Sequence, residues 1–205
     1  MEYQKFKAIL NKEIFEESKP KLIENIAKYP GRYIGLFRPT KPKTKIIQNL
    51  LQSHEIRFGN AFEILIEEYL RQNDFSIINK KLHNNNANLM IDQCFSKDNT
   101  VYFIEQKLRD DHDSSKKRGQ IQNFENKLNE MLKIYNEVNL VGIFYFLDPE
   151  LKKNIKYYKD EIYRMKSDYG VKLHLFYGGE LFSFLKLNGV WEEILVYLKK
   201  WKTEL

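Results

Sequence analysis

The sequence predicts a mixed α/β fold, in which a central mixed β-sheet lies between helices in three layers. Segments in which apolar residues recur at helical spacing alternate with short apolar segments along most of the chain. Two of these short segments, 89–96 and 100–108, are separated by a polar turn and predict a β-hairpin. A third, 140–147, is continuously apolar, which is typical of a strand covered on both faces.

Residues 1–52 are predicted to form an N-terminal helical extension, separate from a unit at 53–205. Apolar residues recur at helical spacing on both sides of Pro20, a residue that suits the start of a helix. The segment 29–45 holds three of the five prolines and cannot form a regular helix. After it, Thr44 can cap a short helix, and a second helix is expected from Ser53 to Gln72.

The rest of the chain predicts strands and helices in turn. A helix is expected at 114–135, where an apolar stripe runs from Phe124 to Tyr135. The last helix, at 190–202, carries Trp191 and Trp201 on its apolar side. The other expected elements are strands at 75–82, 89–96, 100–108, 140–147 and 171–177 and a helix at 150–167.

Composition limits the classes of protein to which the chain can belong. Its net charge is +6 over 205 residues, which favours a nucleic acid or an anionic membrane surface as partner. No apolar run reaches the length of a membrane span, and charges near Met1 argue against an export signal. Cys94 is the single cysteine, which excludes an internal disulfide and any zinc site that needs two cysteines. The sequence therefore predicts a cytoplasmic protein.

A cluster of charged residues falls on the predicted hairpin. Successive side chains of a strand alternate between its faces, so Glu105 and Lys107 are expected to point the same way. An acid and a lysine on a strand that otherwise reads as core are costly to bury unless they are paired or bind a metal. The hairpin can bring Asp92 beside Glu105, and two adjacent carboxylates repel each other unless a cation lies between them. A hard divalent ion such as Mg²⁺ suits these oxygen ligands.

Asp92 and the sequence Glu105-Gln106-Lys107 resemble the active-site motif of the PD-(D/E)xK nuclease superfamily, with Ile91 where the motif name places proline. The order of the predicted elements, a helix, three strands, a helix and a strand, is also similar to that of the superfamily, so the resemblance covers about residues 53–147. Within the superfamily the chain is most similar to a type II restriction endonuclease, because it is short and has no ATP-binding P-loop. The resemblance implies a restriction-endonuclease-like core, with 53–205 as the nuclease domain.

The resemblance also implies the roles of the motif residues in a Mg²⁺-dependent hydrolysis of phosphodiester bonds. Asp92 and Glu105 would bind Mg²⁺, for which Mn²⁺ can substitute, and the carbonyl of Gln106 would supply another oxygen. Lys107 would orient or deprotonate the attacking water, or stabilise the phosphate. These three roles of Lys107 stay open at the level of the sequence.

Two further active-site residues are expected on the helices that flank the hairpin. Glu63 resembles the helix acid that many superfamily members carry before the first strand, and it would add a metal ligand directly or through water. Glu67, one helical turn later, is the competing candidate. On the following helix, Gln120 resembles the polar residue that borders the site, with Gln122 as the alternative.

Two basic segments are predicted to contact DNA, although each can also be read as a solvated basic surface. They contain Arg32, Arg38, Lys41, Lys43 and Lys45 before the core, and Arg109, Lys116, Lys117 and Arg118 after the motif. Between the latter, Asp110, Asp111 and Asp113 predict a polar turn that caps the next helix.

The predicted activity is sequence-specific cleavage of double-stranded DNA. The expected partners are the DNA, a second copy of the chain in a homodimer and, genetically, a cognate DNA methyltransferase. The alternatives are a structure-specific nuclease of the same superfamily, such as a Holliday-junction resolvase or repair nuclease, a catalytically silent DNA-binding module, and an RNase.

Overall fold

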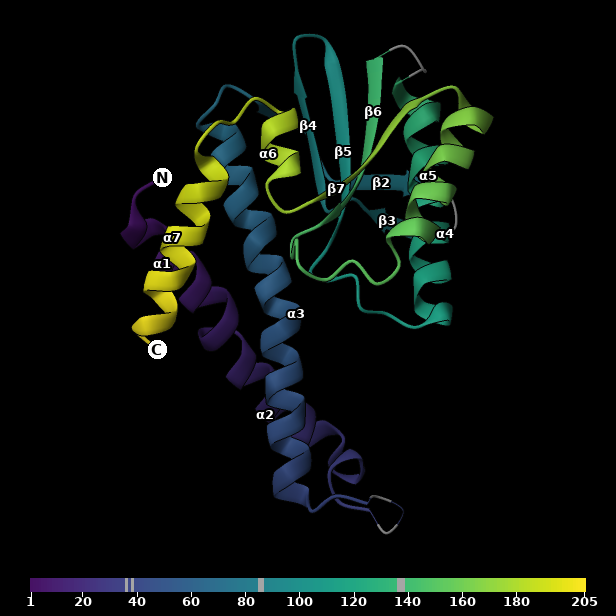
Figure 1. The fold of residues 1–205 in the computed structure, drawn as a ribbon. Coiled ribbons are helices and arrows are strands. Elements are labelled where there is room, and N and C mark those ends of the chain that lie inside the picture. Colours follow the sequence, from purple (N-terminus) through teal and green to yellow (C-terminus); the bar gives the residue numbers. More distant parts are fainter. Residues whose placement is uncertain (36, 38, 85–86, 136–138) are drawn as a thin grey trace. The chain divides into compact units, whose positions relative to one another are not determined.

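The computed structural model describes residues 1–35, 37, 39–84, 87–135 and 139–205. The chain divides into two compact units, one formed by Met1–Ile66 with Lys200–Leu205 and the other by Glu67–Lys199. Figure 1 shows the elements along the chain. The division falls within two helices, α3 (Pro42–Arg71) and α7 (Val190–Thr203), so each of these helices contributes residues to both units.

The first unit is helical. Its elements are α1 (Tyr3–Asn11), the π-helical turn η1 (Lys12–Glu16), α2 (Ser18–Lys28), the 3₁₀ turn η2 (Pro30–Arg32) and the first part of α3. Phe6, Leu10 and Ile14 are buried at helical spacing. The last turn of α7 contacts the same helices, because the Trp201 indole donates a hydrogen bond to Asn11 Oδ1 at 2.9 Å and stacks with the rings of Phe15 and Phe58. The helical character expected for the N-terminal segments is confirmed.

Helix α3 differs from the expectation of two helices, one capped by Thr44 and one beginning at Ser53. The structure has a single helix of 30 residues that begins at Pro42. Residues 43–58 contain neither proline nor glycine, so nothing in this segment interrupts the helical hydrogen bonds. The prediction of two helices is wrong, because no residue of this segment ends the first helix before Ser53.

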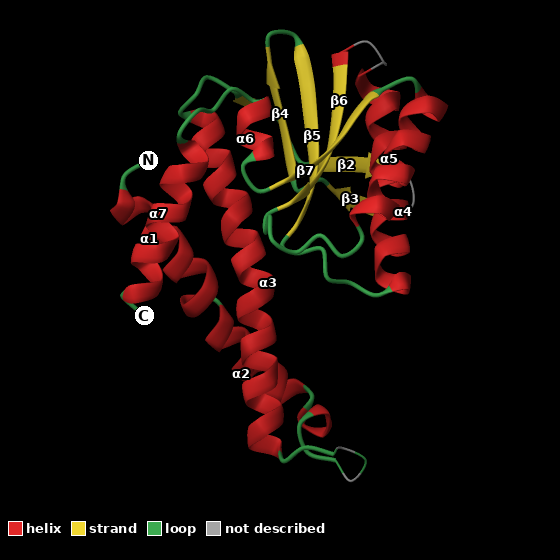
Figure 2. Ribbon diagram, viewed as in Figure 1, coloured by secondary structure: helices red, strands yellow, loops and turns green. Residues whose placement is uncertain are grey.

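The second unit contains the predicted mixed sheet. Its strands are β1 (Ser76–Ile77), β4 (Gln93–Lys97), β5 (Thr100–Lys107), β6 (Leu140–Phe146) and β7 (Lys172–Tyr177). The described strands lie in the order β1-β4-β5-β6-β7. Neighbours from β1 to β5 are antiparallel, and β5, β6 and β7 run parallel. Figure 2 shows the sheet and, separate from it, a hairpin of β2 (Lys81–Asn84) and β3 (Ala87–Met90).

The strands predicted at 75–82 and 89–96 are each divided in the structure. The first becomes β1 and β2, and the second becomes β3 and β4, because the chain leaves the central sheet to form the β2–β3 hairpin. Asp92 therefore lies in the break between β3 and β4 and not within a strand. Periodicity alone could not reveal this break, because both halves of each segment are extended.

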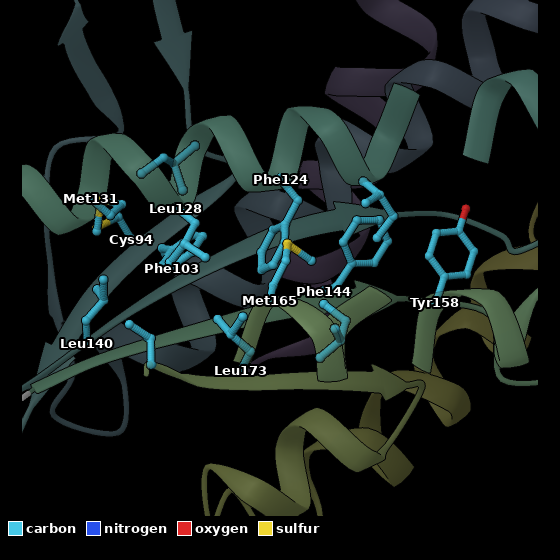
Figure 3. Close-up of a cluster of buried hydrophobic side chains, with 14 of the residues drawn as sticks. Cys94, Phe103, Phe124, Leu128, Met131, Leu140, Phe144, Tyr158, Met165 and Leu173 are labelled. Atoms are coloured by element: carbon cyan, nitrogen blue, oxygen red, sulfur yellow. The ribbon is translucent and has the colours of Figure 1, made fainter. Parts of the chain in front are cut away.

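Helices cover both faces of the sheet, which confirms the three-layer prediction. On one face lie α4 (Ser114–Tyr135), which matches the expected bounds, and α5 (Ile155–Tyr169), which begins five residues later than expected. Figure 3 shows the core between this face and the helices, where the Phe103 and Phe124 rings stack at 5.3 Å and the Phe144 and Tyr158 rings at 5.1 Å. On the other face, Phe184 of the short helix α6 (Glu180–Phe184) contacts Tyr102.

Gly142 is required by the close packing of this core. A Cβ atom there would lie 2.6 Å from Leu173 Cδ2 and 2.7 Å from the ring of Phe103. These contacts are well inside van der Waals separation, so β6 can lie between its two neighbours only if residue 142 has no side chain.

Among the described residues, no helix is both long enough and apolar enough to cross a membrane.

Candidate active site

The break before β4 and the alternation of β5 bring the motif residues together. Gln93 pairs with Ile104, so the residue before β4 lies beside Glu105. The Gln106 backbone N–H donates a hydrogen bond to Asp92 Oδ2 at 2.7 Å and fixes that carboxylate against the strand. Glu105 and Lys107 lie on the face of the sheet that α4 covers, while Gln106 points the other way.

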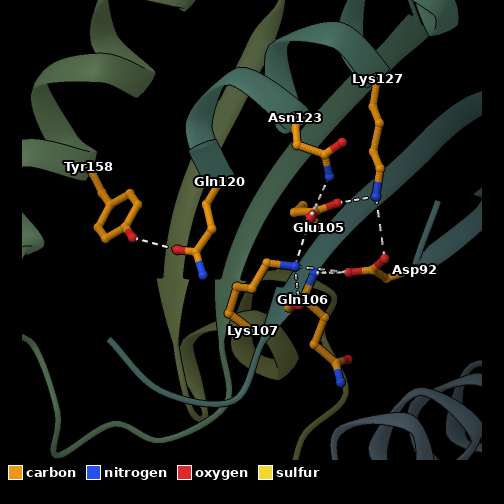
Figure 4. A network of polar contacts seen from close by, with 8 residues as sticks. All are labelled: Asp92, Glu105, Gln106, Lys107, Gln120, Asn123, Lys127 and Tyr158. Atoms are coloured by element: carbon orange, nitrogen blue, oxygen red, sulfur yellow. Dashed lines mark hydrogen bonds and ion pairs between the residues drawn. The ribbon is translucent and has the colours of Figure 1, made fainter. Parts of the chain in front are cut away.

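Three oxygen atoms converge on the ammonium group of Lys107. Its Nζ lies 2.7 Å from Glu105 Oε1, 3.0 Å from the carbonyl oxygen of Gln106 and 3.7 Å from Asp92 Oδ2. Figure 4 shows this arrangement. A single positive charge thus occupies the point shared by two carboxylates and a carbonyl.

Two residues of α4 complete the cluster. Lys127 forms an ion pair with Glu105 Oε2, and its Nζ lies 3.4 Å from Asp92 Oδ1. The Asn123 amide donates a hydrogen bond to Glu105 Oε1 at 3.1 Å. Neither residue was predicted from the sequence. The available signal was that Lys127 is adjacent to Leu128, within the apolar stripe of α4.

Glu105 is charged although only 1% of its surface is exposed. Burial by itself would raise the pKa of its carboxyl, but the positive charges of Lys107 and Lys127 outweigh this effect and hold the pKa below its usual value. The two acids and two lysines together carry no net charge, which is how a cluster with so little solvent can be stable.

The other predicted helix residues are placed differently. Gln120 accepts a hydrogen bond from the Tyr158 hydroxyl at 2.7 Å, and Gln122 donates to Asn126 at 3.2 Å. The structure therefore brings Asn123, not either glutamine, to the carboxylates. Glu67 forms ion pairs with Arg71 at 2.7 Å and Lys80 at 3.1 Å.

Glu63 lies on the part of α3 that belongs to the first unit, whereas Asp92 and Glu105 belong to the second. Its role as a metal ligand stays a prediction. Among the described residues, no group of three or more histidine, cysteine, aspartate or glutamate side chains is arranged to hold a metal ion. A cation at this site would have to use two carboxylates together with a main-chain carbonyl.

One family model matches the chain. The sequence profile of the type II restriction endonuclease HinfI matches residues 2–91 and 75–202, which together span nearly the whole chain. The chain belongs to the HinfI family. As a type II restriction endonuclease it is a hydrolase that acts on DNA, and the polar cluster formed by Asp92, β5 and α4 is its candidate active site. No curated protein sequence matches this member of the HinfI family.

The basic residues predicted to contact DNA fall in both units of the HinfI-family chain. Arg32, Lys41 and Lys43 are exposed in the first unit, Lys45 is half-buried there, and Arg38 lies outside the described residues. In the second unit, Lys116 and Arg118 are exposed and Arg109 is half-buried. Lys117 instead donates to Asn154 Oδ1 at 3.2 Å and lies over the Tyr157 ring.

The acids between these basic residues have distinct structural roles. Asp113 Oδ1 accepts a hydrogen bond from the Lys116 backbone N–H at 2.8 Å, which is the helix cap expected at the start of α4. Asp110 is fully buried and accepts hydrogen bonds from Asn154 and from the Tyr177 hydroxyl. It joins the chain after β5 to the start of α5, so the basic segment leaves the active-site strand at a fixed point.

Proposed function

We propose that this restriction endonuclease is a Mg²⁺-dependent enzyme of the PD-(D/E)xK superfamily that cleaves double-stranded DNA at a specific sequence. The observation that carries the proposal is the convergence of Asp92, Glu105 and the Gln106 carbonyl on one positive charge. Oxygen atoms from two carboxylates and a carbonyl are the ligands that Mg²⁺ prefers, and Mn²⁺ accepts the same set.

The donor set fits a divalent cation in place of the Lys107 ammonium. Asp92, Glu105 and the Gln106 carbonyl would hold the ion, and Glu63 is proposed as a further ligand, directly or through water. A cation bound there would supply positive charge against the phosphate and lower the pKa of the attacking water. Because Mg²⁺ binds to sites that leave coordination positions for water and phosphate, few protein ligands are needed.

The two lysines have separate proposed roles. Lys107 side-chain atoms are 24% exposed, whereas those of Lys127 are 5% exposed. Lys107 can therefore move away from the carboxylates toward substrate, where it would orient or deprotonate water or stabilise the phosphate. Lys127 stays between Asp92 and Glu105 and holds both carboxylates in place.

Incubation of unmethylated phage DNA with the purified protein and Mg²⁺ tests this proposal. We expect discrete fragments from the wild type, and a loss of cleavage of at least about 100-fold in Lys107→Ala, as for removal of one charged active-site donor. Lys133→Ala is the matched control, since Lys133 is an exposed lysine of α4 that pairs only with Glu130 among the described residues. It should cut like the wild type.

Any other outcome of this cleavage experiment would support a different function. A smear, or cleavage of branched DNA alone, would point to a structure-specific nuclease. Intact DNA under both Mg²⁺ and Mn²⁺, with DNA binding retained, would point to a silent binding module. Cleavage without added metal and in the presence of EDTA would refute the proposed cofactor.

The proposed partners are tested separately. A homodimer would sediment at about twice the mass of the 24.7 kDa chain, and it would present two active sites to the two DNA strands. A cognate DNA methyltransferase is proposed because a sequence-specific nuclease endangers the genome of its own cell. A neighbouring methyltransferase reading frame, and protection of DNA by its product, would be the expected findings.

A further inference from the structure

The first unit contains a hollow of about 370 Å³ that is lined by helices distant in the sequence. It lies between α2, the η2 turn and α3, entirely within this unit. Asn49, Ile56 and Asn60 line it from α3 at spacings of seven and four residues, so they share one face of that helix. Tyr33, which is 5% exposed, closes the side formed by η2.

Three cations line this hollow. Lys21 comes from α2, Arg32 from η2 and Arg57 from α3, and no carboxylate is among the described residues of the lining. The Arg32 guanidinium lies 4.2 Å from the centre of the Tyr29 ring, which holds it near the rim. Arg57 donates a hydrogen bond to the Glu13 carbonyl at 3.3 Å, and its guanidinium lies 4.0 Å from Glu17 Oε2. The positive charge of the hollow therefore comes mainly from Lys21 and Arg32, and it is suited to an anion.

Four carboxamide side chains line the same hollow: Asn25, Asn49, Gln52 and Asn60. Within the described part of the chain, none of the four amides has a side-chain hydrogen bond to another residue. Their donors and acceptors are therefore available to a ligand. An anion needs no such amides, so their presence beside the cations indicates a ligand that also carries donors and acceptors.

We infer that this hollow holds part of the DNA duplex and reads its sequence, with phosphates against the three cations and base edges against the amides. The inference rests on the proposed sequence-specific cleavage and assigns part of the specificity to the first unit. Asparagine and glutamine form paired hydrogen bonds with adenine, and arginine forms them with guanine. Lysine and arginine contacts to phosphate position the duplex without reading it.

The amides are tested with the double variant Asn49→Ala/Gln52→Ala. Its matched control is Gln48→Ala, an exposed amide of α3 that does not line the hollow. Phage DNA is cut by each protein in Mg²⁺, and the fragment ends are sequenced to define the cleaved sites. Equal urea midpoints for the three proteins check that both variants fold, as expected for side chains at the surface.

We expect the double variant to accept sites that the wild type rejects, with the preference at one or more base pairs reduced roughly 5- to 150-fold. The control should keep the wild-type sites. If the wild type cuts defined sites and the double variant cuts the same sites with the same preference, this inference alone fails. If the wild type cuts no defined sequence, the proposed function fails with it. Should the double variant not fold, Gln52→Glu replaces it, because a carboxylate cannot donate a hydrogen bond to a base edge and should therefore change the cleaved sites in the same experiment.

The cations are tested through the salt dependence of DNA binding in Ca²⁺, which replaces Mg²⁺ so that binding is measured without cleavage. Lys21→Ala should weaken binding equally for all sequences and reduce the slope of log affinity against log salt by about 1. Lys19→Ala, an exposed lysine of α2 that does not line the hollow, is the control. Identical slopes for the two variants would overturn the assignment of phosphate contacts to the hollow.

Discussion

Lys127 is almost completely buried between two carboxylates, a rare environment for a lysine side chain. Its burial is tolerated because Glu105 is buried with it, so neither charge is left alone in a region of low dielectric constant. Asp92 and Lys107 form a second pair of opposite charges, nearer to solvent. The cluster is thus an electrostatic unit in which each charge depends on the others.

Replacing Lys127 with methionine should destabilise the protein and impair cleavage. We expect the free energy of unfolding to fall by about 1–3 kcal/mol, because Glu105 loses one of its two ammonium partners while Lys107 remains. Urea unfolding measures this loss. Lys133→Met, on the exposed side of the same helix, should unfold like the wild type. Equal stability of the Lys127 and Lys133 variants would show that the buried ion pair contributes nothing.

Strand β6 is the element whose packing is most sensitive to side-chain size. All of its residues are buried, and at Gly142 the neighbouring strands leave no room for a methyl group. The sequence showed that 140–147 is covered on both faces, but it could not show which residue meets which neighbour. That information comes from the parallel register of β5, β6 and β7.

Gly142→Ala should lower the free energy of unfolding by about 1–3 kcal/mol, the usual cost of forcing extra volume into a packed core. The control is Gly119→Ala in α4, where an added Cβ meets nothing within 4 Å. That variant should be more stable by about 0.5–1 kcal/mol, since alanine favours the helix over glycine. Thermal melting measures both effects. Melting temperatures that shift in the same direction from the wild-type value would contradict this prediction.

The end of α3 predicts a pH dependence of stability. Burial would raise the pKa of Glu67, but hydrogen bonds and positive charge from Arg71 and Lys80 lower it below its ordinary value of 4.5. A carboxyl whose pKa is lower in the folded state stabilises the fold above that ordinary value, and the contribution is lost as the pH falls through the folded pKa.

In Glu67→Gln this contribution is absent at every pH. The wild type should therefore be more stable at pH 7 by up to about 1 kcal/mol, as for partly exposed ion pairs. The difference should shrink as the pH falls below 4.5. Urea unfolding of both proteins from pH 7 to pH 3 measures it. A difference that is constant over this range would rule out Glu67 as the titrating group.

On the scale of the whole molecule, the net charge of +6 indicates binding that weakens with salt. Lys116 and Arg118 lie exposed at the start of α4, on the same unit as the active site. We expect Arg118→Ala to reduce the slope of log affinity against log salt by about 1 in Ca²⁺. Lys166→Ala on α5, also exposed, is the control. If Arg118→Ala and Lys166→Ala give the same slope, the DNA contacts lie elsewhere.

The sequence alone predicted the type and order of most elements of the second unit, and it predicted that Asp92, Glu105 and Lys107 lie close together. The elements and this proximity are confirmed because helical and strand periodicity are local, and because Glu105 and Lys107 lie on one strand. The bounds of α4 and of the strand that carries the motif needed no tertiary information.

Only the tertiary structure decided what those elements place together. Lys127 and Asn123 reach Glu105 from a helix about 20 residues away, and the hollow of the first unit forms between helices that periodicity describes one at a time. The break at Asp92 depends on how the strands pair, since the chain leaves the central sheet there to form the β2–β3 hairpin. The physical reason is that periodicity specifies which face of an element is buried, whereas packing specifies which residues of another element meet that face.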